Sequence, residues 1–278
     1  MYKDDTKLFF SPLPEIIFNP QAPPTYSIAE SLCSCTGPSC HESENSLIHK
    51  YPQIARDILS PLVKRHARRM AERPGGLNTT ALWRSSLSPP DSSTPVSGHT
   101  PGHAALPLIP QVAIHYRCGD NDVGVYGLLA YSSVLRRIPE YATSIYVMTE
   151  DEHRKTRPEQ RAVCRAVLHS LHKRLSLRFP LAAVLVLRGA DIYDDFTRLA
   201  SAAISICSVS TFCFWAAIGA EGGTVYMPQS KLIAAGTTPN YGSNIVWMNR
   251  TTDYVVPGPV IARFGRMPRR VVDMLGGP

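Results

Sequence analysis

The chain has 278 residues, 44% of them hydrophobic, and is therefore long and apolar enough to bury a full core in one large or two small domains. This composition excludes a mainly disordered protein. The formal net charge of +7 favours an anionic partner, such as a nucleotide-sugar, a nucleic acid, an acidic glycan or a membrane surface, without choosing among them.

The seven cysteines are too few for a scaffold built from disulfides, and their odd number leaves at least one without a partner in the chain. Cys33, Cys35 and Cys40 lie in a short polar segment and indicate local disulfides formed in an oxidising compartment. A zinc knuckle completed by His41 is the alternative, although its spacing differs from the usual pattern.

The N-terminal part, residues 1–73, is predicted to contain loops followed by one amphipathic helix at residues 48–73. Pro52 suits the first turn of this helix, whereas Pro61 is expected to end or kink it. The second half of this helix contains a cluster of basic residues, which predicts that one face of the helix is exposed to solvent. A nucleic-acid patch is the alternative, but no aromatic residues are interleaved with the charges as single-strand binders require, so no nucleic-acid partner is expected. The cluster consists of Lys64, Arg65, His66, Arg68 and Arg69.

The next segment, residues 74–110, consists for more than half of Pro, Gly, Ser and Thr and predicts a flexible linker or insertion. It contains one N-x-[ST] sequon at Asn78, and a second lies at Asn249. Such sequons fit a protein of the secretory lumen but also arise by chance. The sequence begins with no signal peptide or visible membrane anchor.

An apolar strand at residues 112–120 runs directly into His115, Arg117, Gly119 and Asp120. Runs of small and β-branched residues are typical of buried parallel strands, and ligands in open α/β sheets bind beyond the carboxyl ends of such strands. The guanidinium of Arg117 offers paired donors for phosphate or carboxylate, and Gly119 allows the backbone to approach a ligand closely. A structural ion pair between Arg117 and Asp120 explains the same residues equally well.

Strands and helices then alternate, which predicts a parallel, Rossmann-like sheet. One helix begins at Pro158 and repeats apolar residues at every fourth position, so it is expected to bury one stripe. An uncharged run at residues 201–220 has the length of a membrane span, but its polar residues favour a buried strand and helix joined by a turn. Further strands are expected at residues 144–148, 181–187, 203–207 and 224–227, and further helices at residues 191–202 and 211–219.

The stretch at residues 208–217, Ser-Val-Ser-Thr-Phe-Cys-Phe-Trp-Ala-Ala, opens the last of these helices. Ser210 and Thr211 are expected at the helix N-terminus, where backbone N–H groups and the helix dipole attract anions. One of the two hydroxyls is also expected to cap the helix, and an ordinary cap is the alternative to an anion site.

Together the two stretches resemble the fucosyltransferase superfamily that carries a His-x-Arg motif near its donor site and a Ser-Thr-Phe-Ser-x-Trp-like motif downstream. The likeness is closer to the α-1,2-fucosyltransferases than to the protein O-fucosyltransferases, and it covers roughly residues 111–230. Cys118 and Cys213 depart from the pattern, since many α-1,2 enzymes have a second basic residue and a serine there. The matching residues are His115, Arg117, Gly119, Asp120, Ser210, Thr211, Phe212 and Trp215.

The resemblance implies a two-domain GT-B fold in which residues 111–236 form the nucleotide-sugar-binding domain. It implies GDP-fucose as donor and inverting transfer to a glycan or glycoprotein hydroxyl, with neither a metal nor another cofactor. Arg117 would stabilise the leaving GDP, and His115 would orient the phosphates or Arg117; no catalytic base is assigned. Donor contacts are expected from Gly119, Asp120, Thr149, Glu150, Asp195, Ser210, Thr211 and Phe212.

Other interpretations stay open beside this one. Asp120 and Asp122 match an Asp-x-Asp motif with which another transferase class holds Mg²⁺ or Mn²⁺. A catalytically inactive relative that keeps the donor fold and a basic module that binds anionic polymers are rival functions. The resemblance implies the Golgi or another secretory lumen, with membrane association only through an anchor outside this sequence. Residues 237–278 are predicted to be an irregular basic tail.

Overall fold

The computed structural model describes residues 52–73, 106–118, 127–149, 158–188, 191–229, 244–255 and 268–276. All of these residues belong to one compact unit, Leu47–Pro278. The elements in chain order are α4 (Pro52–Glu72), β1 (Val112–His115), β2 (Leu128–Leu129), α6 (Tyr131–Leu135), β3 (Ser144–Thr149), α7 (Pro158–Arg178), β4 (Ala183–Arg188), α8 (Ile192–Ser201), β5 (Ile204–Cys207), α9 (Thr211–Gly219), β6 (Thr224–Pro228), β7 (Ile245–Met248), α10 (Arg250–Asp253), β8 (Tyr254–Val255) and α12 (Pro268–Gly276).

The main sheet has the strand order β4-β3-β1-β5-β6-β7, and all of its neighbouring strands are parallel. The chain runs from β1 outward through β3 to β4 and then returns to β5 on the other side of β1. This reversal makes the boundary between β1 and β5 the topological switch point, where open α/β sheets bind ligands. The predicted Rossmann-like parallel sheet is confirmed.

Two separate hydrophobic cores fill the two faces of this sheet, because successive strand residues point to opposite sides. On β1, Val112 and Ile114 belong to one core and Ala113 to the other. All three are fully buried, as expected for a central strand covered on both faces. The sheet therefore holds β1 rigidly and fixes the position of whatever follows its carboxyl end.

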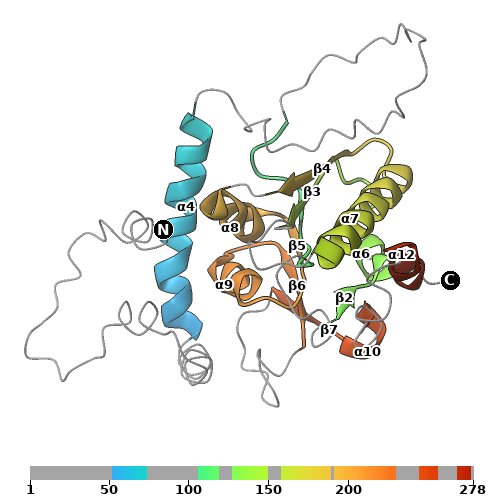
Figure 1. Cartoon of the computed structure of the whole chain (residues 1–278). Helices are drawn as coiled ribbons and strands as arrows, with labels where there is room; N and C mark the ends of the chain where they lie inside the picture. Colours follow the sequence, from blue (N-terminus) through green and yellow to red (C-terminus); the bar gives the residue numbers. More distant parts are fainter. Residues whose placement is uncertain are drawn as a thin grey trace, which may run out of the picture. The chain divides into compact units, whose positions relative to one another are not determined.

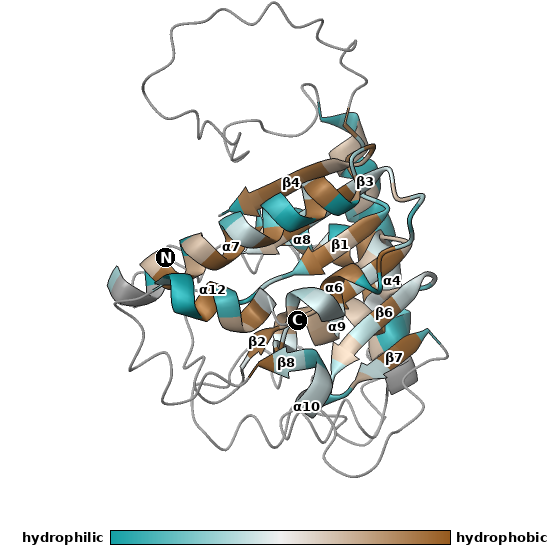
Figure 2. Ribbon diagram, turned by 90° about the vertical axis from the view of Figure 1, so that its right-hand side faces the viewer, coloured by the Kyte–Doolittle hydropathy of each residue, from teal (hydrophilic) through white to brown (hydrophobic). Residues whose placement is uncertain are grey.

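Helices cover both faces, as Figure 1 shows: α6, α7 and α12 lie on one side of the sheet, α8 and α9 on the other. The fourth-residue stripe of α7 is buried as predicted, with Val167, Leu171 and Leu175 fully enclosed. In Figure 2 this helix carries both hydrophilic and hydrophobic stretches, whereas β4 beside it is largely hydrophobic. Helix α4 packs outside α8 and α9, where the Ser60 hydroxyl donates to the Gly219 carbonyl at 3.0 Å.

Several elements differ from the sequence-based expectations. Helix α4 runs through Pro61 instead of ending there, because its packing on α8 and α9 compensates for the missing hydrogen bond. Leu181 is 93% exposed and precedes β4, although it was expected inside a buried strand. The segment predicted to be an irregular tail supplies β7, which forms the sixth strand of the sheet, and α12, which packs on α7.

The uncharged run at residues 201–220 contains the end of α8, strand β5 and helix α9, which confirms a strand and a helix joined by a turn. Among the described helices, none combines the length and the apolar character that crossing a bilayer requires.

Candidate functional site

Two backbone contacts bring the predicted motifs together at the carboxyl edge of the sheet. Strands β1 and β5 are neighbours, with His115 opposite Cys207 in the register. The N–H of Ser208 donates to the His115 carbonyl at 2.9 Å, and the N–H of Arg117 donates to Ser208 Oγ at 3.2 Å. The chain that carries His115 and Arg117 is thus tied to the turn that leads into α9, at the switch point of the sheet.

The N-terminus of α9 lies at the end of this turn. Ser210 occupies the N-cap position in an extended conformation, but its side chain makes no capping hydrogen bond. One of the hydroxyls of Ser210 and Thr211 was expected to cap the helix, but the residue at the N-cap position, Ser210, does not use its buried hydroxyl for the helix backbone. Thr211, the first helical residue, is exposed. Hydroxyls and N–H groups at a helix start are suited to bind an anion.

An aromatic contact joins the two motifs a second time. The ring centroids of His115 and Phe212 are 5.7 Å apart, and those of Phe212 and Phe196 are 5.6 Å apart. The three rings therefore form a row from the end of β1 through α9 to α8. Phe212 was expected to contact the donor, and its position beside His115 gives it a further role, because packing of the two rings restricts how the imidazole can turn.

Thr149 is the last residue of β3, the neighbour of β1 on the side opposite β5, and it stabilises the same carboxyl edge of the sheet. Its buried hydroxyl donates to the Tyr116 carbonyl at 2.7 Å, while the Tyr116 hydroxyl donates to the Leu129 carbonyl at 2.8 Å. Burial raises the pKa of Tyr116 well above its ordinary value, so the phenol stays protonated. Thr149 thus supports the backbone next to Arg117, and its oxygen can still accept a hydrogen bond from a ligand.

The two cysteines that depart from the family pattern both form disulfides. Cys118 pairs with Cys164 on α7, and Cys207 pairs with Cys213 on α9. The first bond tethers the residue after Arg117 to a helix on one face of the sheet. The second spans the Ser208 to Ser210 turn from the end of β5 to the first turn of α9. Both bonds restrict the backbone of the site.

Asp195 lies within α8 and pairs with buried Arg198, whose Nη1 donates to Asp195 Oδ1 at 2.8 Å. Burial raises the pKa of Asp195 to about 7, and the attraction of Arg198 only partly opposes this shift. Arg198 also donates to the Leu108 carbonyl, which precedes β1. Asp195 is therefore engaged in packing α8 on the sheet, and no described contact brings it to Arg117.

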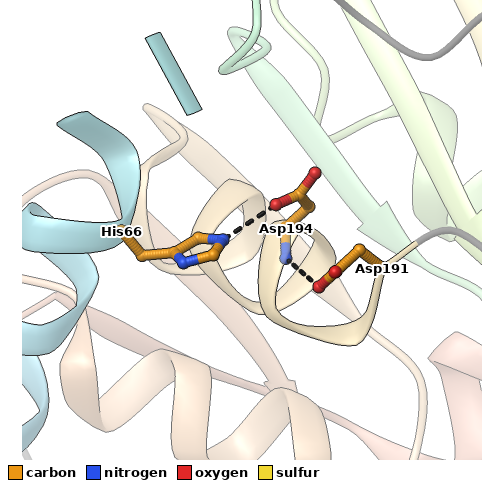
Figure 3. A group of neighbouring side chains, drawn as sticks. All are labelled: His66, Asp191 and Asp194. Carbon is orange, nitrogen blue, oxygen red and sulfur yellow. Dashed lines mark hydrogen bonds and ion pairs between the residues drawn. The ribbon is translucent and has the colours of Figure 1, made fainter. Parts of the chain in front are cut away.

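A group of His66, Asp191 and Asp194 places one ligand atom of each residue within 4.8 Å of the others (Figure 3). His66 Nε2 lies 2.8 Å from Asp194 Oδ1, and Arg73 donates to both carboxylate oxygens of Asp194 at 3.0 Å. Burial alone would raise the pKa of Asp194, but His66, Arg73 and Arg198 outweigh it and lower this pKa. Asp194 is thus neutralised by cations of the chain, and the group joins α4 to α8.

Asp191 has its own structural role in this group. Its Oδ1 accepts hydrogen bonds from the N–H groups of Tyr193 and Asp194, at 2.8 and 3.3 Å, and caps α8. A cation at this place would have to compete with the basic side chains that already hold Asp194. An ion-pair network with a helix cap accounts for the whole arrangement.

Several residues singled out from the sequence lie outside the described part of the chain. They are Gly119, Asp120, Asp122 and Glu150 of the expected site, and Cys33, Cys35, Cys40 and His41.

Two residues at the carboxyl edge of the sheet were not singled out from the sequence. Ser208 is the polar residue that follows β5, and Arg188 ends β4 opposite Thr149. Arg188 could have been identified by the sequence pattern that pointed to Arg117, which is an arginine at the end of an apolar strand.

The chain matches no family model, no curated protein and no solved structure. The site therefore has to be interpreted from its own chemistry. The segments that carry an arginine, a histidine, two hydroxyls and a helix N-terminus meet at the switch point of a parallel sheet. This set of donors is suited to bind a phosphorylated ligand.

Proposed function

We propose that the protein is a glycosyltransferase that moves fucose from GDP-fucose to a glycan or glycoprotein hydroxyl, with inversion and without a metal. The observation that carries this proposal is the pair of hydrogen bonds that ties the His115-Tyr116-Arg117 segment to Ser208 at the switch point. The two stretches that resemble a fucosyltransferase donor site, 91 residues apart at Arg117 and Ser208, are thereby in contact, which supports the proposal that they act together. The proposal includes a GT-B architecture, in which a second domain contributes to acceptor binding.

In such a transfer the acceptor hydroxyl gives its proton to a base and its oxygen attacks the anomeric carbon of fucose, while the bond from that carbon to the GDP oxygen breaks. Negative charge develops on the departing diphosphate, and donors fixed in advance at that place lower the barrier. Arg117 would supply a guanidinium, and Ser210 and Thr211 would supply hydroxyls beside the positive end of α9. His115, held against Phe212, would orient the phosphates or Arg117.

The positive charge for the diphosphate comes from the chain itself in this proposal. Arg117 lies three residues before Asp120 in the sequence, and an arginine that binds the diphosphate supplies the positive charge that a metal would otherwise bring. We expect GDP binding and any transfer or donor hydrolysis to persist in excess EDTA. Activity that EDTA abolishes and Mn²⁺ restores would instead make the two aspartates metal ligands.

A thermal-shift comparison tests the donor class. A ligand that binds only the native state stabilises it by about 2.7 kcal/mol at a concentration of 100 Kd. We expect GDP and GDP-fucose to raise the melting temperature and UDP to leave it unchanged. A response to no nucleotide, or an equal response to UDP, would contradict the proposal.

A catalytically inactive donor-binding protein would use the same contacts. Hydrolysis of GDP-fucose, followed by release of GDP, separates the two functions. Slow hydrolysis that depends on Arg117 supports an enzyme. Nucleotide binding without any hydrolysis or transfer supports the inactive relative.

A further inference from the structure

We propose that Asn249 is a site of N-linked glycosylation. The residue begins the sequon Asn249-Arg250-Thr251, in which the middle position is not proline. It directly follows β7 and precedes α10, and both Asn249 and Thr251 are exposed. A glycan can therefore be accommodated without opening either core of the domain.

The disulfides supply an independent argument for the required compartment. Cys118–Cys164 and Cys207–Cys213 both join side chains that are almost completely buried. Disulfides form and persist in oxidising environments and are rare in the cytosol. In the ER lumen, which is one such compartment, a chain that folds around two disulfides also meets the machinery that glycosylates exposed sequons.

The hydrogen bonds that organise the turn at Asn249 do not involve its side-chain nitrogen, Nδ2, which is the atom that would receive the glycan. Asn249 Oδ1 accepts from the Thr251 N–H at 2.9 Å and from the Thr251 hydroxyl at 2.7 Å. The backbone N–H of Asn249 donates to Asp253 Oδ2 at 2.8 Å. All three bonds fix the residue through its oxygen or its backbone, and none of them uses Nδ2.

The same geometry suits the chemistry of the transfer. Two donors on Oδ1 stabilise the negative charge that the oxygen gains when Nδ2 gives up a proton, and the deprotonated amide nitrogen is the form that acts as nucleophile. Nδ2 forms a bond to the anomeric carbon of the first sugar of a lipid-linked oligosaccharide. The bond from that carbon to the lipid pyrophosphate breaks, the pyrophosphate leaves, and the amide nitrogen loses one proton.

Asn249 lies at the carboxyl edge of the sheet, directly after a strand away from the switch point. Strand β7 is three positions from β1 in the sheet, and strands are spaced about 4.8 Å apart, so their axes are separated by about 14 Å. Asn249 is not among the residues assigned to the donor. The outcome for glycosylation is therefore independent of whether GDP-fucose binds.

The test expresses the full chain behind a cleavable secretory leader in cultured eukaryotic cells, with Asn78→Gln in every variant so that only one sequon remains. Gel mobility is compared before and after an amidase that removes N-glycans, on both intracellular and secreted protein. Mass spectrometry then locates the asparagine that the amidase converts to aspartate.

Two conservative substitutions provide the controls. Asn249→Asp removes the acceptor nitrogen but keeps the oxygen that accepts from Thr251, and Thr251→Ser keeps the sequon. We expect an amidase-sensitive shift in the Asn78→Gln chain and in Thr251→Ser, and its loss in Asn249→Asp and Thr251→Ala. An unmodified Asn249 in the Asn78→Gln chain, or a shift that persists in Asn249→Asp, would overturn the proposal.

Discussion

The backbone N–H of Arg117 donates a hydrogen bond to Ser208 Oγ across 3.2 Å, although 91 residues separate the two in the sequence. Ser208 is buried and also donates its own N–H to the His115 carbonyl at 2.9 Å. One serine therefore fixes the backbone on both sides of Tyr116. The position of the arginine proposed to bind the donor depends on this residue.

Ser208→Ala should weaken both stability and GDP binding. It leaves the Arg117 N–H without its acceptor, which costs about 1–3 kcal/mol when the group is buried. Urea unfolding measures the stability, and calorimetry measures the affinity. Ser205→Ala is the matched control, because Ser205, which is buried on β5 just before Ser208, donates to the Leu199 carbonyl at 2.6 Å. Equal loss of affinity in both variants would show that Ser208 has no particular role at the site.

Removal of the hydroxyls at the start of α9 should weaken diphosphate binding more than it weakens the fold. Ser210→Ala or Thr211→Val should lower GDP affinity by about 0.5–1.5 kcal/mol for each ordinary hydrogen bond lost. Because Ser210 makes no capping bond, Ser210→Ala should leave the melting temperature nearly unchanged. Asp191→Ala should do the opposite, since Asp191 caps α8. A large loss of stability with intact affinity in Ser210→Ala would contradict the assignment.

Asp195 should make the protein less stable as the pH rises from about 4 to 7. Its pKa is raised from 3.8 to about 7 by burial, so the folded state binds this proton more tightly than the unfolded state. Each unit of pKa difference corresponds to about 1.4 kcal/mol. Asp195→Asn, which resembles the protonated form, should therefore show a flatter dependence of unfolding free energy on pH over this range.

Asp194→Asn is the control for that measurement, because the pKa of Asp194 is shifted in the other direction. Burial raises it, but His66, Arg73 and Arg198 together lower it below 3.8. The stability that ionised Asp194 contributes is present above its unfolded pKa and is lost only as the pH falls through the folded value. An identical pH profile for Asp195→Asn and the wild-type chain would refute the raised pKa of Asp195.

The central elements of the fold could be predicted because their signals are local. The apolar strand at β1 and the fourth-residue stripe of α7 each lie within one short window, and the start of α9 at Thr211 follows from the break in the apolar run. Strand β7 was missed because its four residues, Ile-Val-Trp-Met, show no apolar–polar alternation and are held in the sheet by pairing with β6. The continuation of α4 past Pro61 likewise depends on tertiary packing.

The site could be predicted only in part for the same reason. His115, Arg117 and Ser210 were identified from motifs, but the hydrogen bond from Arg117 to Ser208 joins segments whose contact no single window contains. The absence of a capping bond at Ser210 depends on a side-chain rotamer, which the sequence does not determine. The partners of Cys118 and Cys213 were equally inaccessible, because cysteine spacing alone does not define pairing.

The affinity of the Arg117 variants for GDP tests the central claim most directly. Calorimetry should compare the GDP affinity of wild type, Arg117→Ala and Arg117→Lys. Arg178→Ala is the control, because Arg178 is an exposed arginine at the end of α7, which leads into the amino end of β4. Hydrogen bonds to charged groups contribute about 1.5–3 kcal/mol, so Arg117→Ala should bind GDP roughly 10- to 100-fold more weakly. Arg117→Lys should also bind weakly, because lysine lacks the paired donors of the guanidinium. Arg178→Ala should bind like wild type, and wild-type affinity in a folded Arg117→Ala protein would contradict the donor site described above.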